Sequence, residues 1–170
     1  GNYFVGDLAD KQVLEQFAKE VIAQHGHVDY LINNALPLMK GINECSYEEF
    51  QYALSVGVTA PFYLTKLFAP YFAEGASIVN ISSCQGEIGA SCESVYASTK
   101  AGISCLSRSL IDEYADTHVR IIDLPLGWVD TDMTARYTKA EKQEFLSANP
   151  QFKAQTKTQV AKTIYDLITK

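Results

Sequence analysis

The sequence predicts an α/β fold with a parallel sheet, because short runs of branched apolar residues alternate with longer segments of helical spacing. Residues Tyr3–Asp7 have the pattern of a strand that ends in a turn, and Asp10 can cap a helix whose apolar residues follow at helical spacing. Gly26 ends that helix, and Val28–Ile32 is a second strand. A strand, a helix and a strand of these lengths predict a right-handed parallel crossover.

Length and composition are those of an ordinary globular domain. The chain has 170 residues, of which 47% are hydrophobic and 20% charged, and its net charge is −6. A chain of this length buries a substantial core. The negative charge, without clusters of Lys or Arg, argues against a nucleic-acid or anionic-membrane surface. No apolar run approaches the roughly 18 residues of a membrane span, and there is no basic-then-apolar leader, so we expect a cytoplasmic protein.

The cysteines and histidines do not form a metal-binding pattern. The four cysteines are Cys45, Cys84, Cys92 and Cys105. They lack CxxC spacing and companion histidines, so we expect free thiols in a reducing cytosol and no metal. The three histidines lie at predicted element ends, where they are expected to cap a helix or contact solvent.

The segment from Ser46 to Phe68 is predicted to be one helix with a local defect. Ser46-Tyr47-Glu48-Glu49 is a capping box, which begins the helix. The apolar residues that follow are too many for a single stripe, so we expect cover on more than one side, from the sheet and a neighbour or from a second subunit. Pro61 should bend the helix or open its hydrogen bonds.

The stretch Ser77–Lys100 joins a strand to a helix and contains a candidate site. A short apolar run predicts a buried strand that ends at Ser83, and a loop with two glycines follows. A helix is then predicted over Val95–Tyr114. Tyr96 and Lys100 are four residues apart on it, so the phenol and the ammonium share one face. A hydroxyl, a phenol and a fixed cation in this arrangement predict a proton-transfer site.

The remaining third of the chain completes the alternation. Val119–Leu124 is predicted to be a strand, and Pro125-Leu126-Gly127-Trp128 a turn or loop after it. Thr131 to Thr158 is polar, with two weakly helical patches, and is predicted to be a mobile flap. A last amphipathic helix spans the apolar positions from Val160 to Ile168.

The chain resembles the short-chain dehydrogenase/reductase family over nearly its whole length. The family signature is Tyr-x-x-x-Lys with a serine thirteen residues before the tyrosine, and Tyr96, Lys100 and Ser83 match it. Three further segments resemble family landmarks, in the family's order. They are Asp7-Leu8, Asn33-Asn34-Ala35 and Gly127-Trp128-Val129-Asp130-Thr131. A lone Tyr-x-x-x-Lys pair is common by chance, whereas the full set is specific. The resemblance implies a Rossmann-like doubly wound parallel sheet, incomplete in this chain.

The resemblance also implies NAD or NADP as cofactor and Ser83, Tyr96 and Lys100 as catalytic residues. Tyr96 would exchange a proton with the substrate oxygen, and Ser83 would hydrogen-bond that oxygen. Lys100 would hold the cofactor ribose, and its charge is expected to lower the pKa of the Tyr96 phenol from its ordinary value of about 10. The implied cofactor-binding residues are Asp7, Leu8, Asn34, Ala35, Tyr96, Lys100, Gly127, Val129 and Thr131.

Each of these residues also has an ordinary structural interpretation. The tyrosine and lysine could be a surface pair on a helix, and the serine a cap. Asp7 could be a turn residue, and Thr131 the N-cap of a following helix. Asn33-Asn34 could cap the end of a strand.

Four features depart from the family pattern. No glycine-rich dinucleotide fingerprint precedes the first helix, and no final strand follows the last one. We therefore expect residues 1–170 to be a single domain of this family that is a fragment of a longer domain. Gly57 stands where the family has a helix asparagine, which implies slower proton transfer. Leu36 and Leu126 replace the glycine and the proline of two family turns.

Three functions remain open at this point. The first is an NAD(P)-dependent oxidoreductase that interconverts an alcohol and a carbonyl by hydride transfer. The second is a non-catalytic pseudoenzyme or scaffold that has lost cofactor binding, and the third is epimerisation or dehydration at the same site. The implied partners are a small-molecule substrate and further copies of the chain. Helices Phe50–Phe68 and Val95–Tyr114 form a two-fold bundle in the family, which implies a homodimer or homotetramer.

Overall fold

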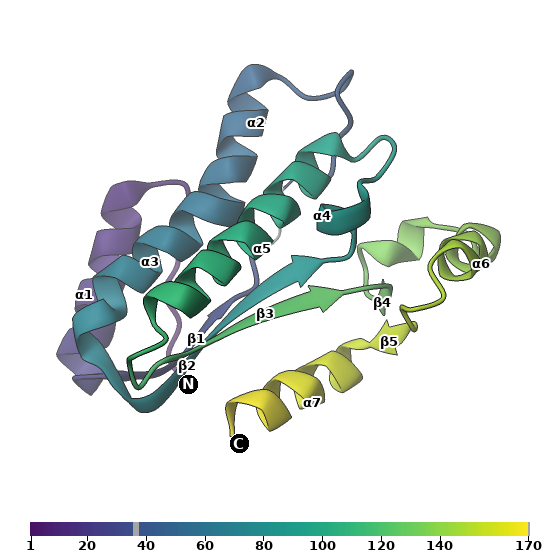
Figure 1. Cartoon of the computed structure of the whole chain (residues 1–170). Helices are drawn as coiled ribbons and strands as arrows, with labels where there is room; N and C mark the ends of the chain where they lie inside the picture. The colour runs from purple at the N-terminus through teal and green to yellow at the C-terminus, as the bar shows by residue number, and fades with distance from the viewer. Residues whose placement is uncertain (36–37, 170) are drawn as a thin grey trace. The chain divides into compact units, whose positions relative to one another are not determined.

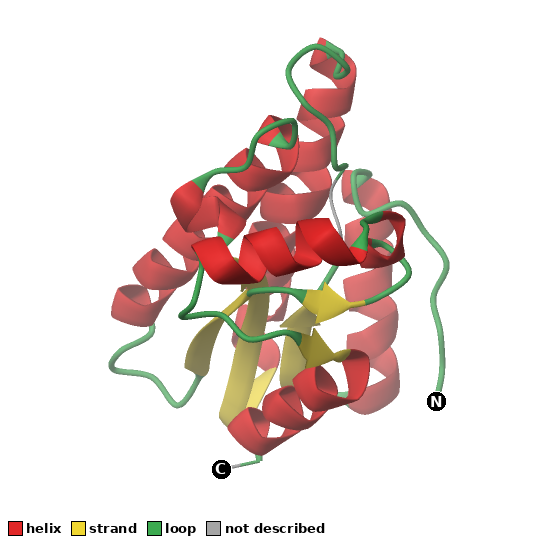
Figure 2. Ribbon diagram, turned by 90° about the vertical axis from the view of Figure 1, so that its right-hand side faces the viewer, coloured by secondary structure: helices red, strands yellow, loops and turns green. Residues whose placement is uncertain are grey.

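The computed structural model describes residues 1–35 and 38–169, and the chain divides into two compact units, Gly1–Leu124 and Pro125–Lys170. Figure 1 labels the elements of both units, and Figure 2 shows that helices supply most of the regular structure. None of the described helices is long and apolar enough to cross a membrane.

The first unit begins with α1 (Lys11–His25) and β1 (Val28–Asn33), close to the predicted bounds. The Asp10 side chain caps α1 by accepting a hydrogen bond from the Gln12 N–H. Gly26 ends the helix with φ at 77°, in the left-handed region that glycine adopts without strain. Both predicted ends of this helix are therefore confirmed.

The first residues of the chain correct one prediction. Residues 3–5 are not a strand: among the described strands none pairs with them, and the Tyr3 and Val5 side chains are exposed. An extended segment becomes a strand only where a neighbouring backbone takes up its hydrogen bonds. The predicted turn after them is present, because Asp7 Oδ1 accepts a hydrogen bond from the Ala9 N–H at 2.9 Å.

The predicted helix between Ser46 and Phe68 is divided into three parts. It consists of α2 (Tyr47–Leu54), a π-helical turn η1 (Ser55–Thr59) and α3 (Ala60–Phe68). A short η2 (Ala69–Tyr71) follows. The capping box at Ser46 is confirmed, since the Ser46 and Glu49 side chains each accept the other residue's backbone N–H.

Pro61 explains the π-helical turn. Proline has no N–H, so the α-helical hydrogen bond that it would donate cannot form. One residue earlier, the Ala60 N–H reaches back five residues to the Ser55 carbonyl, which is the π-type bond. The predicted opening of the helix at Pro61 is thus confirmed, and it takes the form of a widened turn.

A three-stranded sheet forms the centre of the first unit, in the order β1-β2-β3. β2 (Phe72–Ser83) pairs in parallel with β1, with Leu31 opposite Ile78, and β3 (Arg120–Leu126) lies on its other side. α5 (Ser94–Glu113) packs on β2, and α4 (Gln85–Ile88) contacts α5. The arrows in Figure 1 show the three strands running the same way, which is the predicted α/β fold with a parallel sheet.

The core of the first unit lies between this sheet and the helices α1 and α3. Its members come from both helices, from β1 and β2, and from the residue just before β3. They are Leu14, Ala18, Val28, Leu31, Ala60, Leu64, Phe68, Phe72, Ala76, Ile78 and Val119. Leu14 and Ala18 lie on the first predicted helix, and Val28 and Leu31 lie in the predicted strand Val28–Ile32, so the core confirms the spacing from which these two elements were predicted.

The described part of the second unit contains helical segments and a small sheet. The two helical patches predicted between residues 131 and 158 are η3 (Thr134–Arg136) and α6 (Lys139–Ala148). The last helix is α7 (Lys157–Ile168). A parallel pair, β4 (Val129–Asp130) with β5 (Gln155–Thr156), was not predicted, because two residues are too few to show a period.

Candidate active site

Ser83, Tyr96 and Lys100 lie together in the first unit. Ser83 is the last residue of β2, and the other two are on the first turns of α5. Their exposed fractions are 6%, 8% and 5%. The Lys100 Nζ donates a hydrogen bond to the Ile81 carbonyl at 2.6 Å and lies 5.7 Å from the centre of the Tyr96 ring. This burial rules out the interpretation of Tyr96 and Lys100 as a solvated surface pair.

Two glycines, one on α4 and one on α5 itself, allow neighbouring segments to lie close to α5 near these residues. A Cβ at Gly86 of α4 would lie 2.7 Å from the Ala101 backbone N and the Lys100 backbone C. A Cβ at Gly102 of α5 would lie 2.9 Å from the Val58 side chain in η1. Only glycine fits at the first position without moving the main chain. The turn of α5 that contains Lys100 is therefore held between α4 and the π-helical turn.

The electrostatics of Tyr96 differ from the prediction. Burial raises the pKa of the Tyr96 phenol above its ordinary value, and the charge of Glu93 adds to this effect. A hydrogen bond with the Ser83 side chain acts in the opposite direction and is the smaller influence. The predicted lowering by Lys100 is not found, because removal of the phenolate from water outweighs the attractions around it. Tyr96 is therefore a neutral phenol at neutral pH.

Burial has the opposite effect on the pKa of Lys100, which it lowers. Removal from water lowers the pKa of its ammonium from 10.5 to about 8, and the negative charge of Asp123 partly offsets this. The side chain is still mainly protonated at neutral pH. An ammonium carries three donors, of which the Ile81 carbonyl takes one.

The end of β1 is joined to β2 and α5 by polar side chains. The Asn33 side-chain amide donates to Asn80 Oδ1 at 2.7 Å, and Asn80 donates in turn to the Ser107 hydroxyl of α5 at 2.9 Å. This chain of hydrogen bonds ties β1, β2 and α5 together. Asn34 and Ala35 follow it and are exposed. The substituted turn position Leu36 lies outside the described residues.

Asp7 and Leu8 are held by local contacts. Asp7 Oδ1 accepts from the Ala9 N–H in the turn and from the Tyr52 hydroxyl at 3.3 Å. Leu8 packs against the core. The structure thus shows the turn role that the sequence left open for Asp7, which is compatible with a second role toward a ligand.

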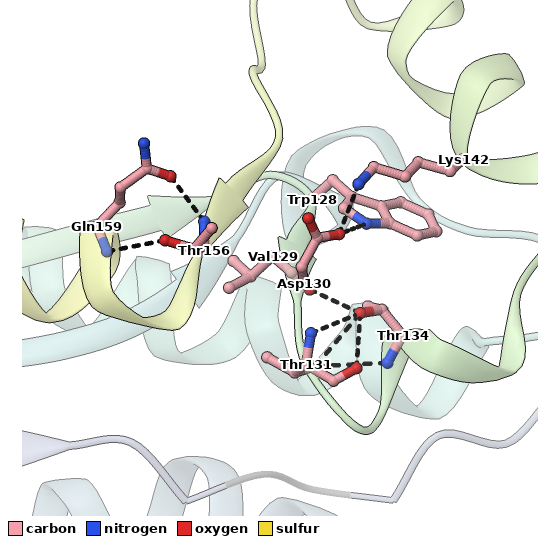
Figure 3. Close-up of polar contacts among 8 residues, drawn as sticks. All are labelled: Trp128, Val129, Asp130, Thr131, Thr134, Lys142, Thr156 and Gln159. Atoms are coloured by element: carbon pink, nitrogen blue, oxygen red, sulfur yellow. Dashed lines mark hydrogen bonds and ion pairs between the residues drawn. The ribbon is translucent and has the colours of Figure 1, made fainter. Parts of the chain in front are cut away.

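Gly127, Val129 and Thr131 belong to the second unit, and Figure 3 shows the last two of them. A Cβ at Gly127 would lie 2.7 Å from the Phe152 Cβ, so this glycine permits close packing. The Thr131 backbone N–H donates to Thr134 Oγ1 at 2.9 Å, and that hydroxyl donates to the Val129 carbonyl at 2.7 Å. These bonds fix the backbone from Val129 to Thr134 as a tight turn that opens η3.

Hydrogen bonds from two other side chains to Asp130 also hold this turn (Figure 3). The Asp130 carboxylate accepts from Lys142 Nζ at 2.6 Å and from the Trp128 indole N–H at 3.0 Å. Both bonds lower the pKa of Asp130, the one from Lys142 more strongly. The polar segment after residue 131 therefore has its own internal framework.

Sequence reasoning missed two acidic residues near the candidate site. Glu93 is buried before the first turn of α5, and its charge acts on Tyr96. Asp123 lies in β3 and accepts a hydrogen bond from Ser104 of α5 at 2.9 Å. An aspartate inside the apolar run Arg120–Leu126 was a usable signal, because a charged residue within a buried strand needs a partner. Among the described residues no group of three or more His, Cys, Asp or Glu side chains could hold a metal ion.

Comparison with known proteins identifies the family of the chain. The family model for short chain dehydrogenases matches residues 2–142. A 3-oxoacyl-[acyl-carrier-protein] reductase of Chlamydia pneumoniae is 28% identical over 159 residues, which cover 92% of this chain and 64% of that protein. A corresponding reductase of Thermotoga maritima is 25% identical, with 86% and 61% covered. The chain belongs to the short-chain dehydrogenase/reductase family.

Solved structures confirm the Rossmann-like fold. An apo SCOR enzyme from Clostridium thermocellum matches with a TM-score of 0.82 at 30% identity, over 99% of this chain and 67% of that one. A blue fluorescent protein from a metagenomic library, in complex with NADPH, matches with a TM-score of 0.83 at 25% identity, over 95% and 66%. The chain thus spans somewhat under two thirds of the length of the curated relatives described above.

Proposed function

We propose that the protein containing this chain is an NAD(P)-dependent oxidoreductase that interconverts an alcohol and a carbonyl, with Tyr96 as general acid and base. The observation that carries this proposal is the buried group formed by Ser83, Tyr96 and Lys100. A hydroxyl, a phenol and an ammonium that converge away from water can bind a carbonyl oxygen and control its proton. The reductase relatives act on carbonyl groups by name, which supports the same reaction class.

The protonation state of Tyr96 favours carbonyl reduction. Because its pKa is raised, the phenol carries its proton at neutral pH and can give it to an oxygen that gains negative charge. The Ser83 hydroxyl would hydrogen-bond the same oxygen and hold it against Tyr96. The charge of Lys100 would stabilise the phenolate that remains after the proton has left. In alcohol oxidation the same residues act in reverse and need a higher pH.

The residues of the chain fit a nicotinamide cofactor. Lys100 has two donors beyond the one that the Ile81 carbonyl takes, and they suit the hydroxyls of a ribose. The exposed Asn34 and Ala35 follow β1 at the carboxyl end of a parallel strand, where ligands bind in open α/β sheets. The proposed cofactor contacts are Asp7, Leu8, Asn34, Ala35, Tyr96, Lys100, Gly127, Val129 and Thr131. When bound, NAD or NADP supplies the hydride chemistry.

Cofactor titration tests the proposal. The sample is a protein that contains this chain and is as long as the relatives. It is titrated with NADPH and with NADH, and the nicotinamide fluorescence is followed. It is then assayed for NAD(P)H oxidation with 3-oxoacyl thioesters and simple ketones. Binding of one cofactor together with carbonyl-dependent oxidation is the expected result. Binding of neither cofactor would refute the proposal and favour a non-catalytic scaffold.

A matched pair of variants separates chemistry from folding. Tyr96→Phe removes the acidic proton and keeps the ring, so we expect turnover to fall by a factor of at least about 100 while cofactor binding is retained. Tyr114→Phe, at the other end of the same helix, is the control and should leave turnover unchanged. Equal turnover in Tyr96→Phe and the unmodified protein would show that Tyr96 is not the acid.

We also propose a homodimer or homotetramer formed through α2, α3 and α5. Phe62 on α3 and Ile111 on α5 are large exposed apolar side chains, as is Tyr52 on α2. Burial of such residues against a second copy is favourable. Sedimentation velocity should give a dimer or tetramer for the protein and a monomer for Phe62→Glu. A monomer in both cases would contradict the assembly.

A further inference from the structure

We propose that Asp123 is a positioning residue that holds the Lys100 side chain in its charged form at the candidate active site. The consequence for catalysis rests on the oxidoreductase function proposed above. The interaction itself does not, because all of its members lie within the first unit and none needs a bound ligand.

The geometry connects the two side chains through Ser104. Ser104 lies four residues after Lys100 on α5, so both point from the same face of the helix. Ser104 Oγ donates to Asp123 Oδ2 at 2.9 Å. Lys100 reaches from that face to the carbonyl of Ile81 on β2, and Asp123 is on the neighbouring strand β3. The carboxylate and the ammonium are thus held between one helix and two adjacent strands.

The second oxygen of Asp123 shows why the pairing matters. Asp123 Oδ1 is buried and has no hydrogen-bond partner among the described residues. A buried carboxylate oxygen without a donor costs free energy unless a positive charge is close by. Lys100 is a buried ammonium that would itself lose its proton more readily without a negative charge nearby. The charge of Asp123 therefore offsets part of the cost of burying the Lys100 ammonium.

The surroundings of Lys100 leave Asp123 as its electrostatic partner. The elements that surround α5 carry several titratable groups. They are Tyr47, Glu48, Glu49 and Tyr52 on α2, Glu74 on β2, Glu87 on α4 with Cys84 just before it, and Arg120 and Asp123 on β3; Glu93 lies just before α5, and Tyr96 is on its first turn. The π-helical turn η1 carries none. Of these described groups, Asp123 is the one whose charge raises the pKa of Lys100, against the larger effect of burial.

Titration of the lysine tests this inference without any cofactor or turnover. The chain is labelled with ¹³C at the lysine ε carbon, and the Lys100 resonance is assigned from Lys100→Arg. We expect its midpoint near the value of about 8 given by burial and Asp123 together. Asp123→Asn removes the charge and can still accept from Ser104, and it should lower the midpoint by about one pH unit. Asp123→Ser is a second neutral variant with the same expected lowering.

Two controls show whether charge or shape is responsible. Asp123→Glu keeps the charge and should keep the midpoint within a few tenths of a unit of the unmodified chain, while Asp112→Asn removes a charge far along α5 and should leave it unchanged. An unaltered or raised midpoint in both neutral variants would overturn the inference. Because no hydride transfer is measured, that result would leave the proposed function standing. Absence of cofactor binding would equally leave the pairing of Asp123 with Lys100 standing.

Discussion

Burial of Lys100 should make the chain more stable in mildly alkaline solution than at neutral pH. Its pKa is about 8 in the folded chain and 10.5 in the unfolded chain. Between these two values the unfolded state binds a proton that the folded state has released. Stability therefore rises with pH across this window, and the full cost of burying the ammonium is present below it.

The magnitude follows from the two pKa values. One pH unit within the window is worth about 1.4 kcal/mol, so the whole window contributes about 3 kcal/mol. Between about pH 7 and about pH 9.5 the contribution is about 2 kcal/mol. Tyr96 and Cys84 act in the other direction, because burial raises the pKa of both and favours the unfolded state at high pH. A comparison with a variant that lacks only Lys100 removes these shared contributions.

Lys100→Met is that variant, since methionine keeps a linear side chain of similar volume without the charge. Urea unfolding of both proteins is followed by far-ultraviolet circular dichroism at a series of pH values. The free energy of unfolding of the unmodified chain, minus that of the variant, should increase by about 2 kcal/mol from about pH 7 to about pH 9.5. Lys19→Met, on the exposed surface of α1, is the control and should show no such increase. A difference for Lys100→Met that stays constant within about 0.5 kcal/mol would refute the reasoning.

Three further predictions concern the elements that hold the site. Ser46→Ala removes the capping box of α2 and should lower the free energy of unfolding by about 1 kcal/mol, as measured by urea titration. Gly102→Ala places a Cβ 2.9 Å from the Val58 side chain and should lower the free energy of unfolding by about 1–3 kcal/mol. Val58→Ala in the same protein should recover most of that loss. If stability is not recovered, the strain lies elsewhere. Gly57→Asn restores the family's asparagine and should raise the turnover of the proposed reaction, so unchanged turnover would show that this position does not limit proton transfer.

The fold could be predicted from the sequence wherever a repeating pattern or a capping residue marked an element. Asp10 and Gly26 marked both ends of α1, and Ser46 marked the start of α2. Residues 3–5 have strand-like composition without a strand beside them, so composition alone gave the wrong answer there. The π-helical turn was foreseen only as a disturbance at Pro61, because the form it takes depends on which carbonyl the Ala60 N–H can reach.

The candidate site could be predicted as a set of residues but not as an electrostatic environment. The spacing of Ser83, Tyr96 and Lys100 was enough to expect that they lie together, since a strand end and one helix face determine their places. The pKa of Tyr96 depends instead on how deeply the ring is buried and on Glu93, and neither is visible in a spacing. The charge of Asp123 acts on Lys100 from the neighbouring strand β3, and an effect of that kind depends on the register of the sheet, which the sequence does not give.

The position of α5 links these observations. Tyr96 and Lys100 reach their places only if this helix lies close to both α4 and the π-helical turn, and a Cβ at Gly86 or at Gly102 would obstruct that approach. Glycine contributes no packing area of its own, so these contacts fix a distance and supply little stability. The buried face of α5 on β2, where Lys100 is also placed, contributes to the free energy that holds the helix. The burial that secures the helix is therefore the same burial that lowers the pKa of Lys100 and raises that of Tyr96, and any substitution that loosens α5 should move both values toward their ordinary ones together.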